Sequence, residues 1–255
     1  AGRVATEGLI GLSTSGSAAA LVEVNSETDF VSRNPDFQAV VLETASLALA
    51  CGGDIDKLRA TDYPGTGRDV DSEIKQLVST IGENISLRRS VGLSVEKGVV
   101  ASYLHAAAAP GLGRIGVLVA ISSEGDADAL NQLGHQLAMH IAAANPKSIS
   151  IADLNADDLE RERNVLRDQA EGSGKPAEIV EKMVEGRLRK YYEEFVLLNQ
   201  IFIIDGESKI SAVLEQAAKD MGTTVEITGM QRLELGEGIE RKNEDFASEV
   251  AAQLK

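Results

Sequence analysis

The chain has 255 residues, of which 43% are hydrophobic and 25% are charged, and this composition is typical of a globular protein. Its 40 acidic residues outnumber the 25 basic ones, and the formal net charge of −15 disfavours direct binding to a nucleic-acid backbone. The single cysteine, Cys51, excludes an internal disulfide, and the apolar runs are too short to span a membrane. We therefore expect a cytoplasmic protein with no membrane segment.

The first part of the sequence has the pattern of a β-hairpin followed by a helix. Two short apolar runs at 8–12 and 18–24 flank a turn-forming segment rich in Ser and Gly. A helix is expected next, because Asn34 can cap its first turn and Pro35 suits the first helical position. Spacings of three and four residues then predict one buried stripe, formed by Phe37, Val40, Val41, Thr44, Ala45 and Ala48.

The same order of elements is expected twice along the chain. A second helix should end at Gly82, and residues 84–93 have the pattern of a third strand. The pattern then returns as a hairpin at 99–106 and 115–122, a helix with the stripe Leu130, Leu133, Leu137 and Ile141, and a strand at 223–235. We interpret this order as a weak internal repeat of one α+β unit.

A long insertion interrupts the second copy. Residues 156–171 and 176–198 are both typical of helices, and the short turn between them predicts an antiparallel helical hairpin. Residues 243–255 have the spacing of a short amphipathic helix. The expected fold is therefore α+β, with two related subdomains that each pack a small antiparallel sheet on helices. The expected divisions are an N-terminal core subdomain at 1–95, a C-terminal core subdomain at 96–155 and 199–238, a helical-hairpin (coiled-coil) insertion at 156–198 and a C-terminal helical module at 239–255.

Two glycine-rich segments resemble nucleotide-binding motifs but lack their context. Residues 111–116 read GLGRIG, yet a strand-like run follows where a dinucleotide site needs a helix. We therefore expect a tight hairpin turn there and no bound cofactor. Residues 172–175 read GSGK, but Pro176 stands where a phosphate loop needs Ser or Thr. His135 and His140 would point about 140° apart around a helix, so they cannot hold one metal ion together.

The segment Thr28-Asp29-Phe30 places a large aromatic residue between strand and helix patterns. The residue pattern alone favours Phe30 as a core residue that closes the helix onto the sheet. The alternative is an exposed loop aromatic that inserts into a partner, where burying the ring contributes roughly 1.5–3 kcal/mol.

Residues 22–31 read VEVNSETDFV and closely resemble the hallmark sequence of the bacterial elongation factor Ts family. Further blocks of the family pattern follow in order across nearly the whole chain: IGENI at 81–85, Arg88-Arg89, SYLH at 102–105, AMHIAA at 138–143, SGKP at 173–176, EKMVEGR at 181–187 and GEGIE at 236–240. The resemblance implies a guanine-nucleotide exchange factor for elongation factor Tu in protein synthesis, which carries out no covalent chemistry.

The resemblance also implies which residues contact elongation factor Tu. Asp29 and Phe30 match the pair that enters the GTPase domain of the partner, within the motif that Thr28 opens, and Phe30 would wedge near its Mg²⁺ and phosphate loop. Ile81 and Gly82 match further contacts to that domain, and His105 matches a contact from the second part of the core. Two alternatives stay open, because Gly82 also suits a helix C-cap and His105 could be packed within its sheet.

Two further expectations complete the sequence-based picture. The family usually begins with a small helical module, and this chain is expected to start after it and to form a weaker complex. The competing function is a non-catalytic acidic scaffold that binds partners through the helical hairpin alone. The two functions differ in where they place the essential residues, in the 28–30 segment or in the hairpin.

Overall fold

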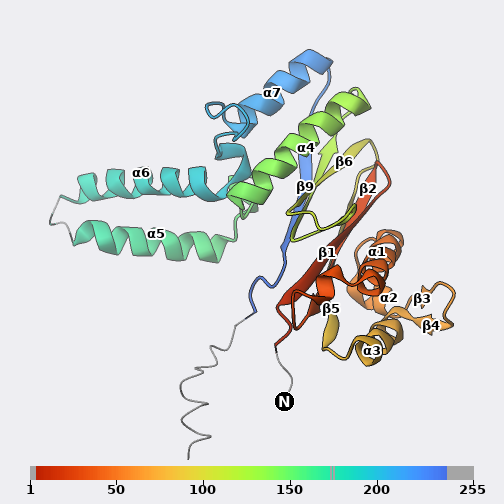
Figure 1. Ribbon diagram of the computed structural model, residues 1–255. Coiled ribbons are helices and arrows are strands. Elements are labelled where there is room, and N and C mark those ends of the chain that lie inside the picture. The colour runs from red at the N-terminus through yellow and green to blue at the C-terminus, as the bar shows by residue number, and fades with distance from the viewer. Residues whose placement is uncertain (1–3, 173, 175, 240–255) are drawn as a thin grey trace, which may run out of the picture.

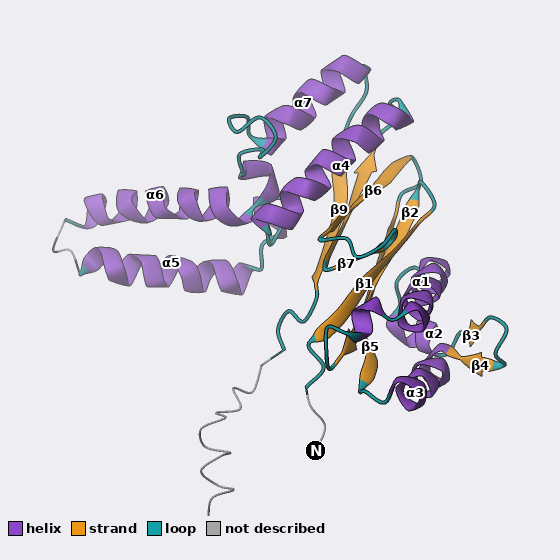
Figure 2. Ribbon diagram, viewed as in Figure 1, coloured by secondary structure: helices purple, strands orange, loops and turns teal. Residues whose placement is uncertain are grey.

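The computed structural model describes residues 4–172, 174 and 176–239. Two small antiparallel sheets pack against each other, and helices cover the outer faces of both (Figure 1 and Figure 2). This arrangement agrees with the expected mixture of small antiparallel sheets and helices. The division into subdomains stays a prediction, and the helix expected within 243–255 lies outside the described residues.

The first sheet is built from the start of the chain. Strand β1 (Glu7–Thr14) pairs with β2 (Ala18–Ser26), which pairs with β5 (Ile85–Ser94). Helices α1 (Pro35–Ala50) and α3 (Val70–Ile81) belong to the same hydrophobic core as this sheet. The chain between them forms the short helix α2 (Ile55–Arg59) and a two-stranded ribbon of β3 (Asp62–Tyr63) and β4 (Arg68–Asp69).

The second sheet repeats the strand order of the first. Strand β6 (Gly98–His105) pairs with β8 (Ile115–Ser122), which pairs with β9 (Glu226–Glu234). In each of these sets of three strands, the second strand in the chain therefore lies between the other two, and the first sheet has β7 as a fourth strand beside β1. Helix α4 (Ala127–Ala144) and helix α7 (Ile210–Met221) share a hydrophobic core with the second sheet.

The central strands are buried on both faces because each one serves two cores. On β2, the alternating residues Ala20, Val22 and Val24 face α1, whereas Ala19 and Leu21 face the other sheet. On β8 the same alternation directs one set of side chains to α4 and the other set to the inter-sheet core: Val117, Val119 and Ile121 to α4, and Leu118 and Ala120 to the inter-sheet core. Because side chains alternate between the two faces of a strand, each sheet packs on helices with one face and on the other sheet with its second face. The layers therefore follow the order helices, sheet, sheet, helices.

Helix α1 begins and ends where its local residues require. The side chain of Asn34 accepts hydrogen bonds from the backbone N–H groups of Asp36 and Phe37, at 2.8 and 3.1 Å. The backbone turns away after Cys51, where Gly53 has a φ of +82° and lies against the backbone of β5. The predicted stripe of this helix is confirmed, since all six of its residues are buried.

The inserted segment forms two helices that pack along each other and project to one side of the sheets (Figure 1). They are α5 (Ala156–Glu171) and α6 (Ala177–Phe195). Their contact is a small core of its own, centred on Ala170, Val180, Val184 and Leu188. The second helix was expected to continue to Leu198 but ends at Phe195. There Val196 pairs with Ser148 in a parallel bridge, and the 3₁₀ turn η3 (Leu197–Asn199) follows.

Two other expectations differ from the structure. The link between β6 and β8 is longer than a tight turn, because β7 (Leu112–Gly113) leaves the hairpin and pairs with Ile10 and Gly11 of β1. The sequence patterns above include no helix at 210–221, where the structure has α7, although the apolar residues there have helical spacing and Gly222 ends the helix with a φ of +67°.

Glu23 on β2 is fully buried and joins the two sheets. Arg88 Nη1 lies 3.0 Å from its carboxylate, and Arg89 also pairs with it. The backbone N–H of Gly236, just after β9, donates to Glu23 Oε1 at 2.8 Å. Arg89 Nη2 also donates to the backbone oxygen of Glu234 at 2.7 Å. We call this set the Glu23 cluster, and it fastens the end of β9 to β2 and β5.

His140 on α4 is buried and orders the segment that leads into α7. Its Nδ1 accepts a hydrogen bond from the backbone N–H of Ile203 at 3.3 Å, so its Nε2 carries the proton toward Gln200 Oε1 at 2.8 Å. Burial lowers the pKa of His140, and the hydrogen bond to Gln200 offsets this only partly. The neutral imidazole is therefore the form that the fold requires.

Candidate protein-interaction site

Phe30 is the most exposed large apolar side chain among the described residues, with 75% of its surface accessible. The prediction from the residue pattern alone, that Phe30 is a core residue, is therefore wrong. Val31, its neighbour, is 4% exposed and takes the core position beneath α1. Phe30 immediately precedes the 3₁₀ turn η1 (Val31–Arg33), and this turn directs the two side chains to opposite environments.

The loop that carries Phe30 is held by hydrogen bonds at its base. Ser26 Oγ donates to the backbone oxygen of Thr28 at 3.0 Å, and Ser32 Oγ donates to that of Asp29 at 2.6 Å. The backbone N–H and the hydroxyl of Thr28 both donate to the carboxylate of Glu83, at 3.1 and 2.7 Å. A loop fixed in this way loses little conformational entropy when its exposed ring binds a partner.

The contact with Glu83 places the end of α3 beside the Phe30 loop. The backbone N–H of Asn84 also donates to Glu27 Oε1, at 3.0 Å, so three hydrogen bonds join the two segments. Ile81 is half-buried and packs on the first core, and Gly82 is exposed. Gly82 has a φ of +83° and donates to the backbone oxygen of Val78, which is the geometry of a helix C-cap.

His105 ends β6 and is exposed rather than packed within its sheet. Its Nδ1 lies 3.1 Å from the hydroxyl of Tyr103, and its backbone oxygen accepts a hydrogen bond from the N–H of Arg114. Arg114 Nη2 lies 3.2 Å from Glu7 Oε2, and Glu7 pairs with Ser26 at the base of the Phe30 loop.

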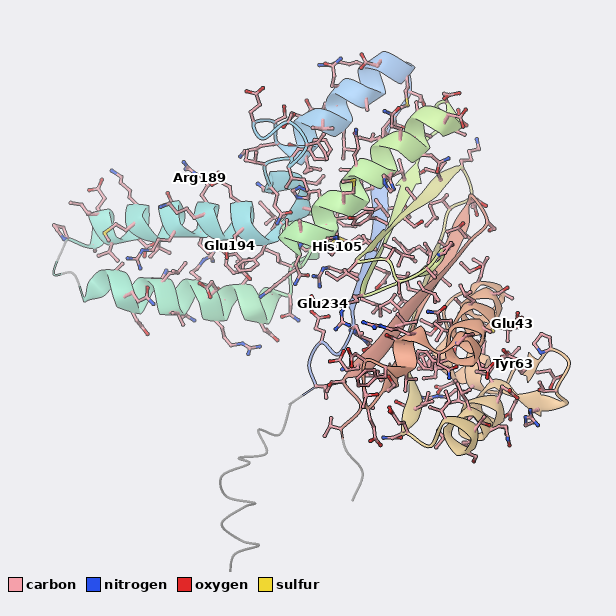
Figure 3. The ribbon with its side chains drawn as sticks, viewed as in Figure 1. Glu43, Tyr63, His105, Arg189, Glu194 and Glu234 are labelled. Atoms are coloured by element: carbon pink, nitrogen blue, oxygen red, sulfur yellow. The ribbon has the colours of Figure 1, made fainter. Side chains whose placement is uncertain are left out.

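The strand register places all of the predicted contact residues at one end of the two sheets. The end of β2 lies beside the start of β5, and the end of β6 lies beside the start of β8 and the end of β9. Figure 3 shows His105 near Glu234, where the second sheet approaches the first. Thr28, Asp29 and Phe30 thus share this end with Ile81, Gly82 and His105. We call it the Phe30 end of the protein.

Glu83 was missed by sequence reasoning, although it supports the loop most directly. It lies 55 residues from Thr28 in the chain, and although it falls within the IGENI block at 81–85, that block does not indicate that its carboxylate binds the loop. The topology creates this contact, because β2 and β5 are neighbours in the sheet.

The described residues contain neither a metal-ligating cluster nor a membrane-spanning helix. Among them, no group of three or more His, Cys, Asp or Glu side chains is arranged to hold a metal ion. None of the described helices has both the length and the apolar character needed to cross a membrane. The GLGRIG segment contains strand β7 and leads directly into β8, so no helix N-terminus is present there for a dinucleotide.

Comparison with known proteins shows which family this chain resembles. Residues 27–237 match the family model described as Elongation factor TS. The chain is 58% identical to Elongation factor Ts of Rhodospirillum rubrum, over all of this chain and 83% of that protein. It is 56% identical to the protein of the same name from Rhodospirillum centenum, over 98% of this chain and 82% of that protein. The corresponding protein of Allorhizobium ampelinum is 52% identical, over all of this chain and 82% of its own length.

Proposed function

The chain belongs to the elongation factor Ts family, and we propose that it promotes release of GDP from the GTPase elongation factor Tu. The names of its relatives support a role in translation elongation. The observation that carries the proposal is the exposure of Phe30 on a hydrogen-bonded loop. An apolar ring that is three-quarters exposed costs free energy in water, and a hydrophobic slot in a partner would recover it.

The proposed mechanism needs no covalent step. Phe30 would enter the GTPase domain near the Mg²⁺ and phosphate loop of elongation factor Tu, with Asp29 beside it. Displacing that Mg²⁺ would remove charge neutralisation from the nucleotide phosphates, so that GDP would leave faster. By linkage, a protein that binds the nucleotide-free GTPase more tightly than the GDP-bound form must weaken GDP binding by the same factor.

Ile81, Gly82 and His105 would extend the contact around the wedge. Ile81 and Gly82 end helix α3, which packs in the core of the first sheet, and His105 ends β6 of the second sheet. The Glu23 cluster holds the two sheets together, so a footprint that includes all three residues would fix the direction from which Phe30 enters. This supports the assignment of His105 as a partner contact, because its side chain is exposed at this end.

The direct test is release of a fluorescent GDP analogue from elongation factor Tu, with the protein added in catalytic amounts. We expect faster release that saturates with protein concentration. Unchanged release at every concentration would refute the proposed function.

Deletion of the helical hairpin separates the exchange factor from the acidic scaffold. The chain segment before the hairpin lies beside the segment that follows it, because Lys147 N–H donates to the Phe195 oxygen at 2.8 Å and Leu197 N–H donates to the Ser148 oxygen at 2.9 Å. Residues 156–194 can therefore be replaced by a short glycine linker that leaves both of these hydrogen-bonding partners in the chain. We expect partial exchange activity to remain, whereas complete loss of partner binding and exchange would favour the scaffold.

A further inference from the structure

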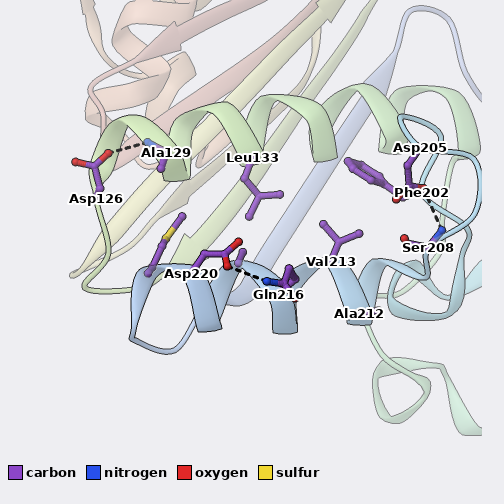
Figure 4. A pocket seen from close by; sticks show the side chains of 12 residues that line it. Asp126, Ala129, Leu133, Phe202, Asp205, Ser208, Ala212, Val213, Gln216 and Asp220 are labelled. Carbon is purple, nitrogen blue, oxygen red and sulfur yellow. Dashed lines mark hydrogen bonds between the residues drawn. The ribbon is translucent and has the colours of Figure 1, made fainter.

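A second surface lies far along the fold from the Phe30 end, between α4 and α7. It is a groove of about 880 Å³, with α4 as one wall and α7 as the other (Figure 4). Leu133, Val213 and Met221 line it with apolar atoms, and the ring of Phe202 closes one end. This volume is that of a typical binding cleft.

Exposed apolar residues flank Phe202, the residue that closes the groove. Ile201, Ile203 and Ile204 are 45%, 46% and 45% exposed and flank Phe202 in the segment that leads into α7. Phe202 itself is buried against His140, with 6.0 Å between the ring centroids. A cluster of exposed isoleucines beside an apolar groove is uncommon on a surface that contacts only water, and it indicates an interaction site.

The charged groups at the rim define what the groove can accept. Asp126 and Asp220 stand toward one end and Asp205 at the other (Figure 4). The lining residues, all of which the structure describes, include no Lys or Arg. Backbone hydrogen bonds from Glu207, with others from Ser208, lower the pKa of Asp205, so that its carboxylate stays ionised at neutral pH.

We propose that this groove binds an amphipathic helix with a basic polar face, supplied by another protein. The apolar face of such a helix would lie on Leu133, Val213 and Met221, and its Lys or Arg residues would pair with the carboxylates at both ends. Helix α7 has 12 residues and is therefore about 18 Å long, which matches a partner helix of about three turns. Nucleic acids, acidic peptides and a second copy of this chain, with its charge of −15, would be repelled by the rim.

The binding test uses a fluorescent peptide of about 15 residues, with Leu at helical spacing and Lys elsewhere, titrated with the full chain. Anisotropy should show saturable binding with a Kd below about 100 μM at physiological salt. The same peptide with Glu in place of Lys should bind at least about tenfold more weakly. Equal binding of the two peptides, or no binding of the basic one, would overturn the proposal.

Two substitutions on α7 form a matched pair. Asp220→Lys reverses a charge at the rim, and Glu215→Lys makes the same change at an exposed position outside the groove. We expect Asp220→Lys to weaken binding of the basic peptide at least about fivefold and Glu215→Lys to change it less than about twofold. Equal effects would show that only net charge matters and would reject the groove.

Val213→Ser tests the apolar contact, with a thermal melt to check the fold. Because Val213 is half-buried against the core of the second sheet, we expect weaker peptide binding together with a modest fall in the melting temperature. Unaltered binding by a folded variant would count against the proposal. Sedimentation of the chain alone tests whether a second copy of the chain occupies the groove. Dimerisation that Val213→Ser abolishes would assign the groove to a second copy and would also overturn it.

Discussion

Replacing Phe30 with alanine should affect exchange and folding very differently. Three quarters of the side chain is available to a partner, and complete burial of a Phe side chain contributes roughly 1.5–3 kcal/mol. Docking would therefore lose about 1.1–2.3 kcal/mol, which corresponds to about a sevenfold to fiftyfold slower stimulated release of GDP. The quarter that is already buried contributes less than about 1 kcal/mol to folding, so the melting temperature should fall by less than about 3 °C.

The assay is the release of a fluorescent GDP analogue from elongation factor Tu at several concentrations of the variant, beside a thermal melt. Leu42→Ala is the matched control, because Leu42 is also an exposed apolar residue, at 38%, and its side chain lies near Gly111 rather than at the Phe30 loop. We expect the control to retain exchange within about twofold. Normal exchange by Phe30→Ala would refute the wedge, and a large loss of thermal stability would show that the ring supports the fold.

Three further substitutions test how the site is supported. Glu23→Ala removes a buried carboxylate and leaves the guanidinium groups of Arg88 and Arg89 without their partner. We expect the free energy of unfolding, measured in urea, to fall by about 3 kcal/mol. A fall of less than about 1 kcal/mol would contradict the role of the Glu23 cluster in holding the two sheets together. The lowered pKa of His140 means that the unfolded chain binds more protons below pH 6.5, so stability should be complete above that pH and should fall as the pH decreases, by at most about 1.4 kcal/mol per pH unit. Urea unfolding at pH 7.5 and 5.5 measures this, and a His140→Gln variant with the same pH dependence would rule His140 out as its source. Gly82→Ala places a Cβ in a left-handed conformation with open space around it, so we expect a loss of about 1 kcal/mol of stability from backbone strain, while a selective loss of exchange at unchanged stability would assign Gly82 to the partner contact instead.

Local signals in the sequence were sufficient to predict the helices whose start and end are marked by their own residues. Asn34 and Pro35 start α1 because a cap and a fixed φ act within one turn, and Gly82 ends α3 for a similarly local reason. Helix α7 could have been found in the same way, since Ile210, Val213 and Leu214 have helical spacing. The contact residues were named through the resemblance of whole sequence blocks to a family, and local pattern alone favoured the wrong environment for Phe30.

What the sequence by itself determined is therefore the longer strands, the helices α1, α3, α4, α5 and α6, and their order along the chain, but neither β7 nor helix α7. Only the tertiary structure decided that Val31 is buried while Phe30 is exposed, since both are apolar residues at the same turn. Only it joined Thr28 to Glu83, and Glu23 to the backbone of Gly236, and only it opened the groove between α4 and α7. The physical reason is range: caps and periodicity act over a few residues, whereas these contacts join segments that become neighbours only after the sheets have formed and packed.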